Sequence, residues 1–376
     1  MKLTRLISKM KIVVTGAQGF IGQNLCIMLE ENGHSDIVRI DRDTSKDQLI
    51  AALQCADFIF HLAGVNRPKD DAEFQQGNAD LTAFIVGELE KSGRKTPLML
   101  SSSTQAEMDN LYGLSKLSAE KAVVAYGVET GAPYFIYRFP NVFGKWCRPN
   151  YNSFVATFCH NIVNNIEITI NNPVAPVTLV YIDDLCHELI GLLKNGTASG
   201  YHQVLPAYST TVGKVSELLH SFKKSRQTLV TENVGQGLER ALYSTYLSYF
   251  SPEQFSYNLP TYSDERGIFC EMLKTEGAGQ FSFFSAHPGI TRGGHYHHTK
   301  NEKFLVVKGS ALFKFKHIVT GECFETTVNS DKTRVVETVP GWSHDITNIG
   351  DDELLVMLWA NEIFDRNAPD TFAYLL

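Results

Sequence analysis

The chain has 376 residues, a length typical of two domains rather than one. Its net charge of −7 without any basic run argues against nucleic acid or an anionic membrane surface as a partner. Seven scattered cysteines and the lack of a membrane-length apolar stretch favour a cytoplasmic protein with neither a disulfide framework nor a membrane anchor.

The N-terminal half alternates short apolar runs with helical stretches. The first ten residues, MKLTRLISKM, are interpreted as an extension before the first strand. We expect an α/β Rossmann-type, doubly wound parallel sheet with crossover helices. Its predicted strands are KIVVT (11–15), DIVRI (36–40), ADFIFHLAG (56–64) and PLMLSSS (97–103), followed by a strand that runs into a loop, PYFIYRFPNVFG (133–144).

Three glycines, Gly16, Gly19 and Gly22, directly follow the first predicted strand and open an apolar helix. Glycines at this spacing permit a tight turn and the close approach of a pyrophosphate, which the helix N-terminus attracts. The strand–loop–helix order therefore predicts a dinucleotide site. The second strand ends at Asp41 and Arg42. An acid there suits the ribose hydroxyls of NAD and an arginine the 2′-phosphate of NADP, so both cofactors stay open.

Tyr112 and Lys116 stand four residues apart, which places both side chains on one face of a predicted helix. An ammonium beside a phenol favours the phenolate, so we expect the pKa of Tyr112 to fall below its ordinary value of about 10. Such a phenol can give a proton to a carbonyl as a hydride arrives. A hydroxyl from SSST (101–104) would orient that carbonyl. The same spacing at Tyr296 and Lys300 is interpreted as coincidence.

The order of glycine loop, HLAG (61–64), serine-ending strand and YxxxK resembles the extended short-chain dehydrogenase/reductase (SDR) superfamily. RFPNVFG (138–144) and YIDDL (181–185) are similar to its downstream signatures, so the resemblance covers about residues 11–240. It implies a catalytic trio of Ser103, Tyr112 and Lys116, with Thr104 as the substitute for Ser103. The implied cofactor contacts are Gly16, Gly19, Phe20, Gly22, Asp41, Arg42, Leu62, Ala63, Gly64, Tyr112 and Lys116.

One departure from that superfamily concerns the substrate pocket. Only nine residues separate Ser103 from Tyr112, far fewer than the superfamily usually has. The loop that normally helps to cover the substrate is therefore missing, and we expect a pocket that is more open or completed elsewhere.

The sequence changes character near residue 250. SYFSPEQFSYNLP (248–260) is aromatic, broken by proline and without period, which is typical of a linker. Short strand-like runs separated by turn signals follow it, and they predict an all-β barrel or jelly roll. These runs are GQFSFFSA, EKFLVVKG, ALFKFKHI, RVVETV and ELLVMLWA.

Four residues of metal-ligating types cluster in this β-rich part. His295 and His297 alternate along a strand, with Glu302 shortly after them and His344 further on. Three imidazoles and a carboxylate suit a divalent transition metal such as Zn, Fe, Ni or Mn. The two segments resemble the two cupin motifs, with a one-residue slip of the proline at Pro340 in the second. His287, His298 and His317 are interpreted as structural.

A sugar-nucleotide substrate is suggested by a segment at the start of the same part. Residues 264–271, DERGIFCE, resemble the DxRGxFxE opening of deoxysugar-nucleotide 3,5-epimerases, which are cupins. A hydrogen at C3 beside a C4 ketone is acidic, so a cupin with a base could invert C3. Reduction of the ketone by the tyrosine–lysine site would then lock the inverted centre. The two halves would thus have consecutive roles.

Nearly the whole chain resembles the bifunctional capsular polysaccharide enzymes that make the UDP-N-acetyl-L-fucosamine precursor. VFGKWCRPNYNS (142–153), LYSTYLSY (242–249), HHTKNEKFLVV (297–307) and the WxNEIFDxNxPDT pattern (359–371) carry this resemblance. It implies that a cupin domain epimerises C3 of a UDP-2-acetamido-2,6-dideoxy-4-hexulose and that an SDR domain reduces C4 with NADPH. The product would be the L-talo sugar, and the zinc ligands would be His295, His297, Glu302 and His344.

The expected organisation is an SDR domain over residues 1–247, a linker over 248–260 and a cupin domain over 261–376. A homodimer is expected from both folds. Two alternatives keep the same fold. One is a nucleotide-sugar epimerase or dehydratase that recycles bound NAD and carries a structural cupin. The other is a nucleotide-sensing protein with an inactive site.

Overall fold

The computed structural model describes residues 10–194 and 196–376. The interpretation of the chain start as an extension falls, apart from Met10, outside these residues. The described residues divide into two compact units, and one of them comprises residues up to Leu219 together with Ser244–Tyr249. The other comprises His220–Tyr243 and Phe250–Leu376. Residues 220–243, which the sequence assigns to the first domain, are therefore grouped with the C-terminal unit.

The N-terminal unit is built on a parallel sheet with strand order β2-β1-β3-β4-β5-β8. These strands are β1 (Ile12–Thr15), β2 (Ile37–Ile40), β3 (Phe58–His61), β4 (Leu98–Ser103), β5 (Tyr134–Phe139) and β8 (Gly200–His202). Apolar side chains make β1 and β3 buried along their whole length, as expected for strands covered on both faces. The predicted Rossmann-type parallel sheet is confirmed.

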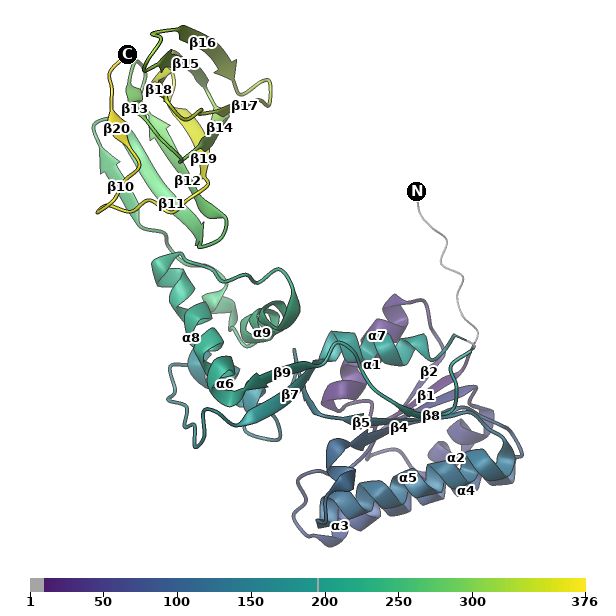
Figure 1. The fold of residues 1–376 in the computed structure, drawn as a ribbon. Coiled ribbons are helices and arrows are strands. Elements are labelled where there is room, and N and C mark those ends of the chain that lie inside the picture. Colours follow the sequence, from purple (N-terminus) through teal and green to yellow (C-terminus); the bar gives the residue numbers. More distant parts are fainter. Residues whose placement is uncertain (1–9, 195) are drawn as a thin grey trace. The chain divides into compact units, whose positions relative to one another are not determined.

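Helices cover both faces of this sheet, with α1 and α7 on one face and α2, α4 and α5 on the other (Figure 1). Their bounds are α1 (Phe20–Glu31), α2 (Lys46–Cys55), α4 (Leu81–Ser92), α5 (Leu111–Thr130) and α7 (Ile182–Gly191). Local sequence sets their ends: Ser45 and Gln48 form a capping box at α2, and the Asn110 side chain accepts from the Gly113 N–H at α5. An apolar cluster that includes Val13, Ile59 and Leu100 fills the space beneath α2, α4 and α5.

The elements between the parallel sheet and the C-terminal strands, together with those that connect the sheet strands, are a small sheet and several helical segments. A three-stranded sheet has the order β6-β7-β9. Its strands are β6 (Asn141–Phe143), β7 (Pro176–Tyr181) and β9 (Tyr208–Thr211). The remaining helical segments are α3 (Ala72–Phe74), the π-helix η1 (Gln75–Asp80), η2 (Thr104–Glu107), α6 (Phe154–Val163), α8 (Val212–Thr228), α9 (Gly237–Leu247) and η3 (Pro252–Gln254). Among the described residues, no helix is both long and apolar enough to span a membrane.

The C-terminal part consists of two antiparallel sheets with orders β10-β11-β12-β19-β14-β17 and β16-β15-β18-β13-β20 (Figure 1). The first contains β10 (Thr261–Asp264), β11 (Gly267–Thr275), β12 (Gly279–Ala286), β14 (Glu302–Lys308), β17 (Val335–Glu337) and β19 (Leu354–Ala360). The second contains β13 (Thr291–Tyr296), β15 (Ser310–His317), β16 (Cys323–Asn329), β18 (Trp342–Asn348) and β20 (Phe372–Ala373). Phe304, Phe313 and Val356 belong to the apolar core of this part. The predicted all-β domain is confirmed.

Candidate functional site

The glycine loop joins β1 to α1 in the order that the sequence predicts. A Cβ added to Gly22 would lie 2.2 Å from the Gly16 carbonyl oxygen, so only glycine allows this close packing of the helix on the loop. Phe20 begins α1. The loop therefore presents a helix N-terminus, which favours an anionic group such as a pyrophosphate.

Asp41, which the sequence predicts to contact the cofactor ribose, forms a hydrogen bond with the glycine loop. Its Oδ1 accepts a hydrogen bond of 2.9 Å from the Gln18 backbone N–H. The carboxylate therefore stabilises the glycine loop. The neighbouring Arg42 is exposed and lies just after the end of β2. Asp41 therefore lies beside the glycine loop, and its contact with a ribose stays a prediction.

The HLAG segment lies against the C-terminal end of β1. The Leu62 N–H donates to the Thr15 carbonyl at 3.2 Å, and the Ala63 N–H donates to the Thr15 hydroxyl at 3.2 Å. His61 is fully buried between the hydroxyls of Thr15 and Thr82. Burial, reinforced by the charge of Lys116, lowers the pKa of His61 to about 3, so this imidazole is a neutral structural group.

Each serine at the end of β4 has a different partner. The Ser101 carbonyl accepts from the Lys116 Nζ at 3.0 Å, and the Ser102 hydroxyl donates to the buried Glu120 carboxylate. The Ser103 hydroxyl hydrogen-bonds with the phenol of Tyr112. Thr104, by contrast, is exposed at the start of η2. The fold thus brings together Ser103, Tyr112 and Lys116 at the sheet edge that carries the glycine loop.

The expected fall in the pKa of Tyr112 is wrong for this structure. Burial raises the pKa of the phenol, and the hydrogen bond with Ser103 only partly opposes this. Lys116 is directed at the Ser101 carbonyl, and burial lowers its own pKa to about 8. The phenol is therefore held in its protonated form, which is the form that a general acid needs.

Asn78 is a component of this site that the sequence did not indicate. Its side chain accepts from the Val65 N–H at 2.9 Å and donates to the Val65 carbonyl at 2.9 Å and to the Ser115 hydroxyl at 3.0 Å. It thereby ties the segment after HLAG to α5. Asn78 lies in the π-helix η1. Helical segments of this type are rare, often occur at functional sites, and have no simple sequence signature.

We predict that Gly64→Ala disturbs the tyrosine–lysine site. A Cβ there would lie 2.8 Å from the Asn78 Oδ1 and 3.0 Å from the Lys116 Nζ, and both side chains are buried and held by hydrogen bonds. Such overpacking costs about 1–3 kcal/mol. We expect that loss of unfolding free energy in urea, together with a change at the tyrosine–lysine site. The matched control is Gly87→Ala in α4, where nothing lies within 4 Å of the added Cβ. An unchanged Gly64→Ala enzyme would contradict the tight placement of Lys116.

The four predicted metal ligands come together in the C-terminal part. Their candidate ligand atoms all lie within 4.8 Å of one another. His295 on β13 pairs in register with His344 on β18, His297 follows the end of β13, and Glu302 begins β14. The last three are almost completely buried. The fold therefore gathers residues that are nearly fifty positions apart, from 295 to 344, into one cluster.

The donor set fits a divalent cation. His297 donates from Nδ1 to the Asp370 carbonyl, which leaves its Nε2 lone pair directed at the Glu302 carboxylate 3.2 Å away. A lone pair facing an anion is unfavourable unless a cation lies between them. Burial lowers the pKa of His295 to about 4, so its imidazole is neutral and able to ligate. Although burial opposes ionisation, the charge of Lys300 helps to keep the pKa of Glu302 below its usual value.

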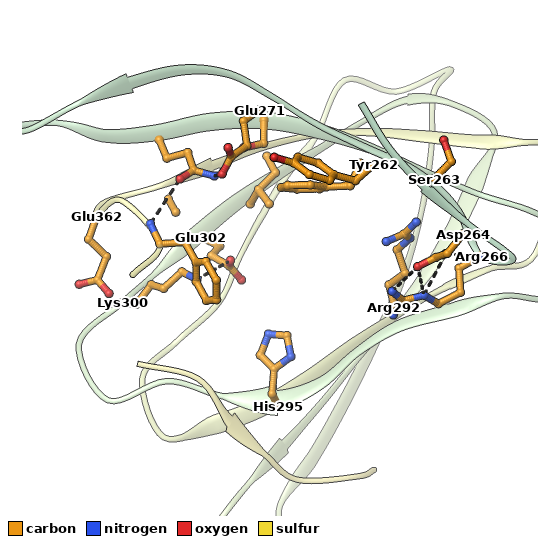
Figure 2. Close-up of a pocket in the computed structure, with 16 residues that line it drawn as sticks. Tyr262, Ser263, Asp264, Arg266, Glu271, Arg292, His295, Lys300, Glu302 and Glu362 are labelled. Atoms are coloured by element: carbon orange, nitrogen blue, oxygen red, sulfur yellow. Dashed lines mark hydrogen bonds and ion pairs between the residues drawn. The ribbon is translucent and has the colours of Figure 1, made fainter. Parts of the chain in front are cut away.

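A cavity of about 530 Å³ adjoins this cluster. Figure 2 shows His295 directed into it, Glu302 and Lys300 at one side, and Arg266 and Arg292 at another. Lys300 is buried, with its Nζ 3.4 Å from the Glu302 Oε1. Sequence reasoning assigned no function to Lys300 or Arg292. Tyr296, four residues before Lys300, stacks on Phe372.

Two family models match the chain. Residues 12–204 match the NAD dependent epimerase/dehydratase family, and residues 262–372 match the polysaccharide biosynthesis C-terminal domain. The first match covers the parallel sheet and the tyrosine–lysine pair. The second covers the metal-ligating cluster and the cavity.

Similar proteins extend over nearly the full chain. A UDP-2-acetamido-2,6-beta-L-arabino-hexul-4-ose reductase of Pseudomonas aeruginosa is 54% identical over 365 residues, covering 97% of this chain and 98% of that enzyme. The crystal structure of the capsular polysaccharide assembling protein CapF of Staphylococcus aureus has a TM-score of 0.90 at 43% identity, covering 98% of this chain and 100% of that one. A UDP-glucose 4-epimerase of Thermotoga maritima, with a TM-score of 0.55 and 18% identity over 64% of this chain and 98% of its own, shares only the fold.

Proposed function

This chain belongs to the NAD dependent epimerase/dehydratase family, and from that membership we propose that it is a bifunctional nucleotide-sugar enzyme. Its C-terminal cupin domain would epimerise C3 of a UDP-2-acetamido-2,6-dideoxy-4-hexulose. Its SDR domain would then reduce the C4 ketone to give the L-talo sugar for a capsule or O-antigen polysaccharide. The Pseudomonas aeruginosa relative, named as a UDP-hexulose 4-keto reductase, supports this substrate class.

The reductase half rests on the residues around Tyr112. NADPH bound at the glycine loop would supply a hydride to C4. The Ser103 hydroxyl would hold the ketone oxygen, and Tyr112 would donate the phenolic proton to it. Burial keeps the pKa of Tyr112 raised, so the proton is present when C4 requires it. Arg42 is available for a 2′-phosphate because it is exposed, whereas Asp41 is engaged by the Gln18 N–H.

The epimerase half rests on the four-residue cluster and its cavity. His295, His297, Glu302 and His344 would hold a divalent metal, most simply zinc. The metal would polarise the C4 ketone and so acidify the hydrogen at C3. The cavity is large enough for a sugar. Its lining includes three side chains that can donate or accept a proton, those of Tyr262, Lys300 and Glu271.

Two arginines give the cavity a cationic side. Arg292 donates from Nε to the Ser285 carbonyl at 3.0 Å and stacks over Phe284. Arg266 lies near enough that its charge, together with burial, lowers the pKa of Arg292. Arg266 already forms an ion pair with Asp264 at 2.6 Å, so Arg292 is the guanidinium more open to a further anion. The diphosphate of a UDP-sugar is such an anion, and guanidinium groups bind phosphate through paired hydrogen bonds.

The observation that carries the proposal is the presence, in one chain, of a tyrosine four residues before a buried lysine and of a largely buried three-histidine, one-carboxylate cluster beside a cavity. Epimerisation requires the ketone and reduction removes it. The order of reactions is therefore fixed by the chemistry, with inversion at C3 first.

The test is to mix the full chain with NADPH and a UDP-4-keto-6-deoxy-N-acetylhexosamine in heavy water. We expect stoichiometric NADPH consumption, slower turnover with NADH, and a product that carries deuterium at C3. Nuclear magnetic resonance identifies both the label and the stereochemistry. Turnover without net NADPH consumption would instead indicate an epimerase or dehydratase that recycles NAD. Substrate binding without turnover would indicate a nucleotide sensor.

A further inference from the structure

The C-terminal strap, defined as residues 370–374, contacts three segments that carry candidate metal ligands. These are β13, the turn that follows it and β18. Its two-residue strand β20 pairs with β13, with Ala373 opposite His295 and Phe372 opposite Tyr296. The Tyr374 N–H donates to the Gly294 carbonyl at 2.8 Å. The Tyr374 carbonyl accepts from the hydroxyl of Ser343, the residue before His344, at 2.5 Å. The strap therefore lies along the strands that hold two ligands.

Asp370 at the start of the strap organises the turn between His297 and Glu302. Its carboxylate accepts from the backbone N–H groups of His298, Thr299 and Lys300 at 2.9, 2.7 and 2.8 Å, and from the Thr299 hydroxyl at 3.0 Å. One carboxylate thus serves three consecutive backbone N–H groups and one hydroxyl of the turn. A charge-assisted set of this kind is stronger than neutral hydrogen bonds and fixes the turn in one conformation.

Asp370 also sets the tautomer of a ligand. Its backbone carbonyl accepts from the Nδ1 of His297, so a proton is held on Nδ1 and Nε2 is the nitrogen that faces the cluster. An outer hydrogen bond of this kind orients a ligating histidine and raises its basicity. Side chain and main chain of one residue thus act together on the segment from His297 to Lys300.

We propose that Asp370 is a positioning residue for the metal centre, and that the C-terminal strap presets the ligand geometry before the metal binds. This inference rests on the metal site of the proposed function. It also gives a role to the Pro-Asp-Thr end of the WxNEIFDxNxPDT pattern, residues 369–371, for which the sequence alone indicated none.

The test compares zinc affinity among full-length variants by competition with a chromophoric chelator. We expect Asp370→Ala to weaken zinc binding about 10–100-fold, the range typical of outer-shell partners, and Asp370→Asn to weaken it less. Cobalt-substituted forms should show altered visible absorption, because the ligand geometry changes. The matched control is Asp365→Ala, an exposed acid in the same segment whose carboxylate contacts the Asn367 N–H. It should bind zinc like the unmodified chain.

Each outcome separates this inference from the proposed function. Equal zinc affinity and identical cobalt spectra in the Asp370 and Asp365 variants would overturn the role of Asp370 and leave the two-step reaction standing. Failure of the unmodified chain to bind zinc would overturn the metal site and this inference together. If Asp370→Ala does not fold, as judged by circular dichroism, the isosteric Asp370→Asn variant decides the question by the same two measurements.

Discussion

Tyr112→Phe should lower the rate of C4 reduction by about 10²–10⁴-fold, the usual contribution of a positioned general acid. The substitution removes the hydroxyl that shares a hydrogen bond with Ser103. It keeps the aromatic ring, whose centroid lies 5.6 Å from that of Phe74. Binding and folding should therefore change little. Single-turnover oxidation of NADPH, followed by absorbance, measures the effect on the chemical step.

Two comparisons make the Tyr112 result specific. Tyr134→Phe removes a phenolic hydroxyl from β5 in the same unit, where Tyr134 is only partly buried, and it should leave the rate unchanged. Deuterium exchange at C3 should also persist in Tyr112→Phe, because the metal-ligating cluster is unaltered. A Tyr112→Phe enzyme that reduces at the normal rate would remove the proposed proton donor.

His344→Ala should abolish deuterium exchange at C3 and weaken zinc binding by about 100-fold or more, beyond the loss caused by outer-shell partners. His344 is almost completely buried, and its Nε2 lies 3.4 Å from the Glu302 Oε2. Its loss opens the ligand set and leaves the Glu302 carboxylate with fewer hydrogen bonds. Exchange is measured by nuclear magnetic resonance in heavy water, and zinc by chelator competition.

The informative comparison for His344→Ala is the reduction of a substrate that already has the inverted C3 centre. We expect that reaction to proceed at the normal rate with NADPH, since no residue of the reductase site is changed. His287→Ala, at an exposed position in the same part of the chain, should preserve both reactions. Loss of both reactions in a folded His344→Ala enzyme would mean that the two domains act as a single site.

The strands that the sequence predicted best are those that are buried along nearly their whole length. Residues 11–15 and 97–103 were predicted as strands, and β1 and β4 occupy Ile12–Thr15 and Leu98–Ser103. Apolar runs of this length have few alternatives in a sheet covered on both faces. The glycine loop and the four candidate metal ligands could be predicted for a related reason, because their chemistry depends on residue type and spacing.

The strands that carry the ligand histidines were harder to predict. β13 (TRGGHY) contains two glycines and no aliphatic residue, and β18 (WSHDITN) is largely polar. His295 and His344 lie in the metal-ligating cluster, whereas Ile346 of β18 packs in the apolar core, so the apolar alternation that marks a strand is weak. Spacing also placed Tyr112 and Lys116 on one helix face without showing that the ammonium is directed at the Ser101 carbonyl. That direction depends on how α5 packs against β4.

The pairing of β20 with β13 has a consequence for the order of events during synthesis. Domains fold as they leave the ribosome, so the parallel sheet up to Gly200–His202 is available early. All four ligands are translated before Asp370, yet the turn that carries His297 is without its main acceptor until Asp370 appears. A nascent chain that displays the ligands but not the strap therefore holds an unfinished site. In the proposed metal site, all four ligands would therefore be translated before the residue that positions them.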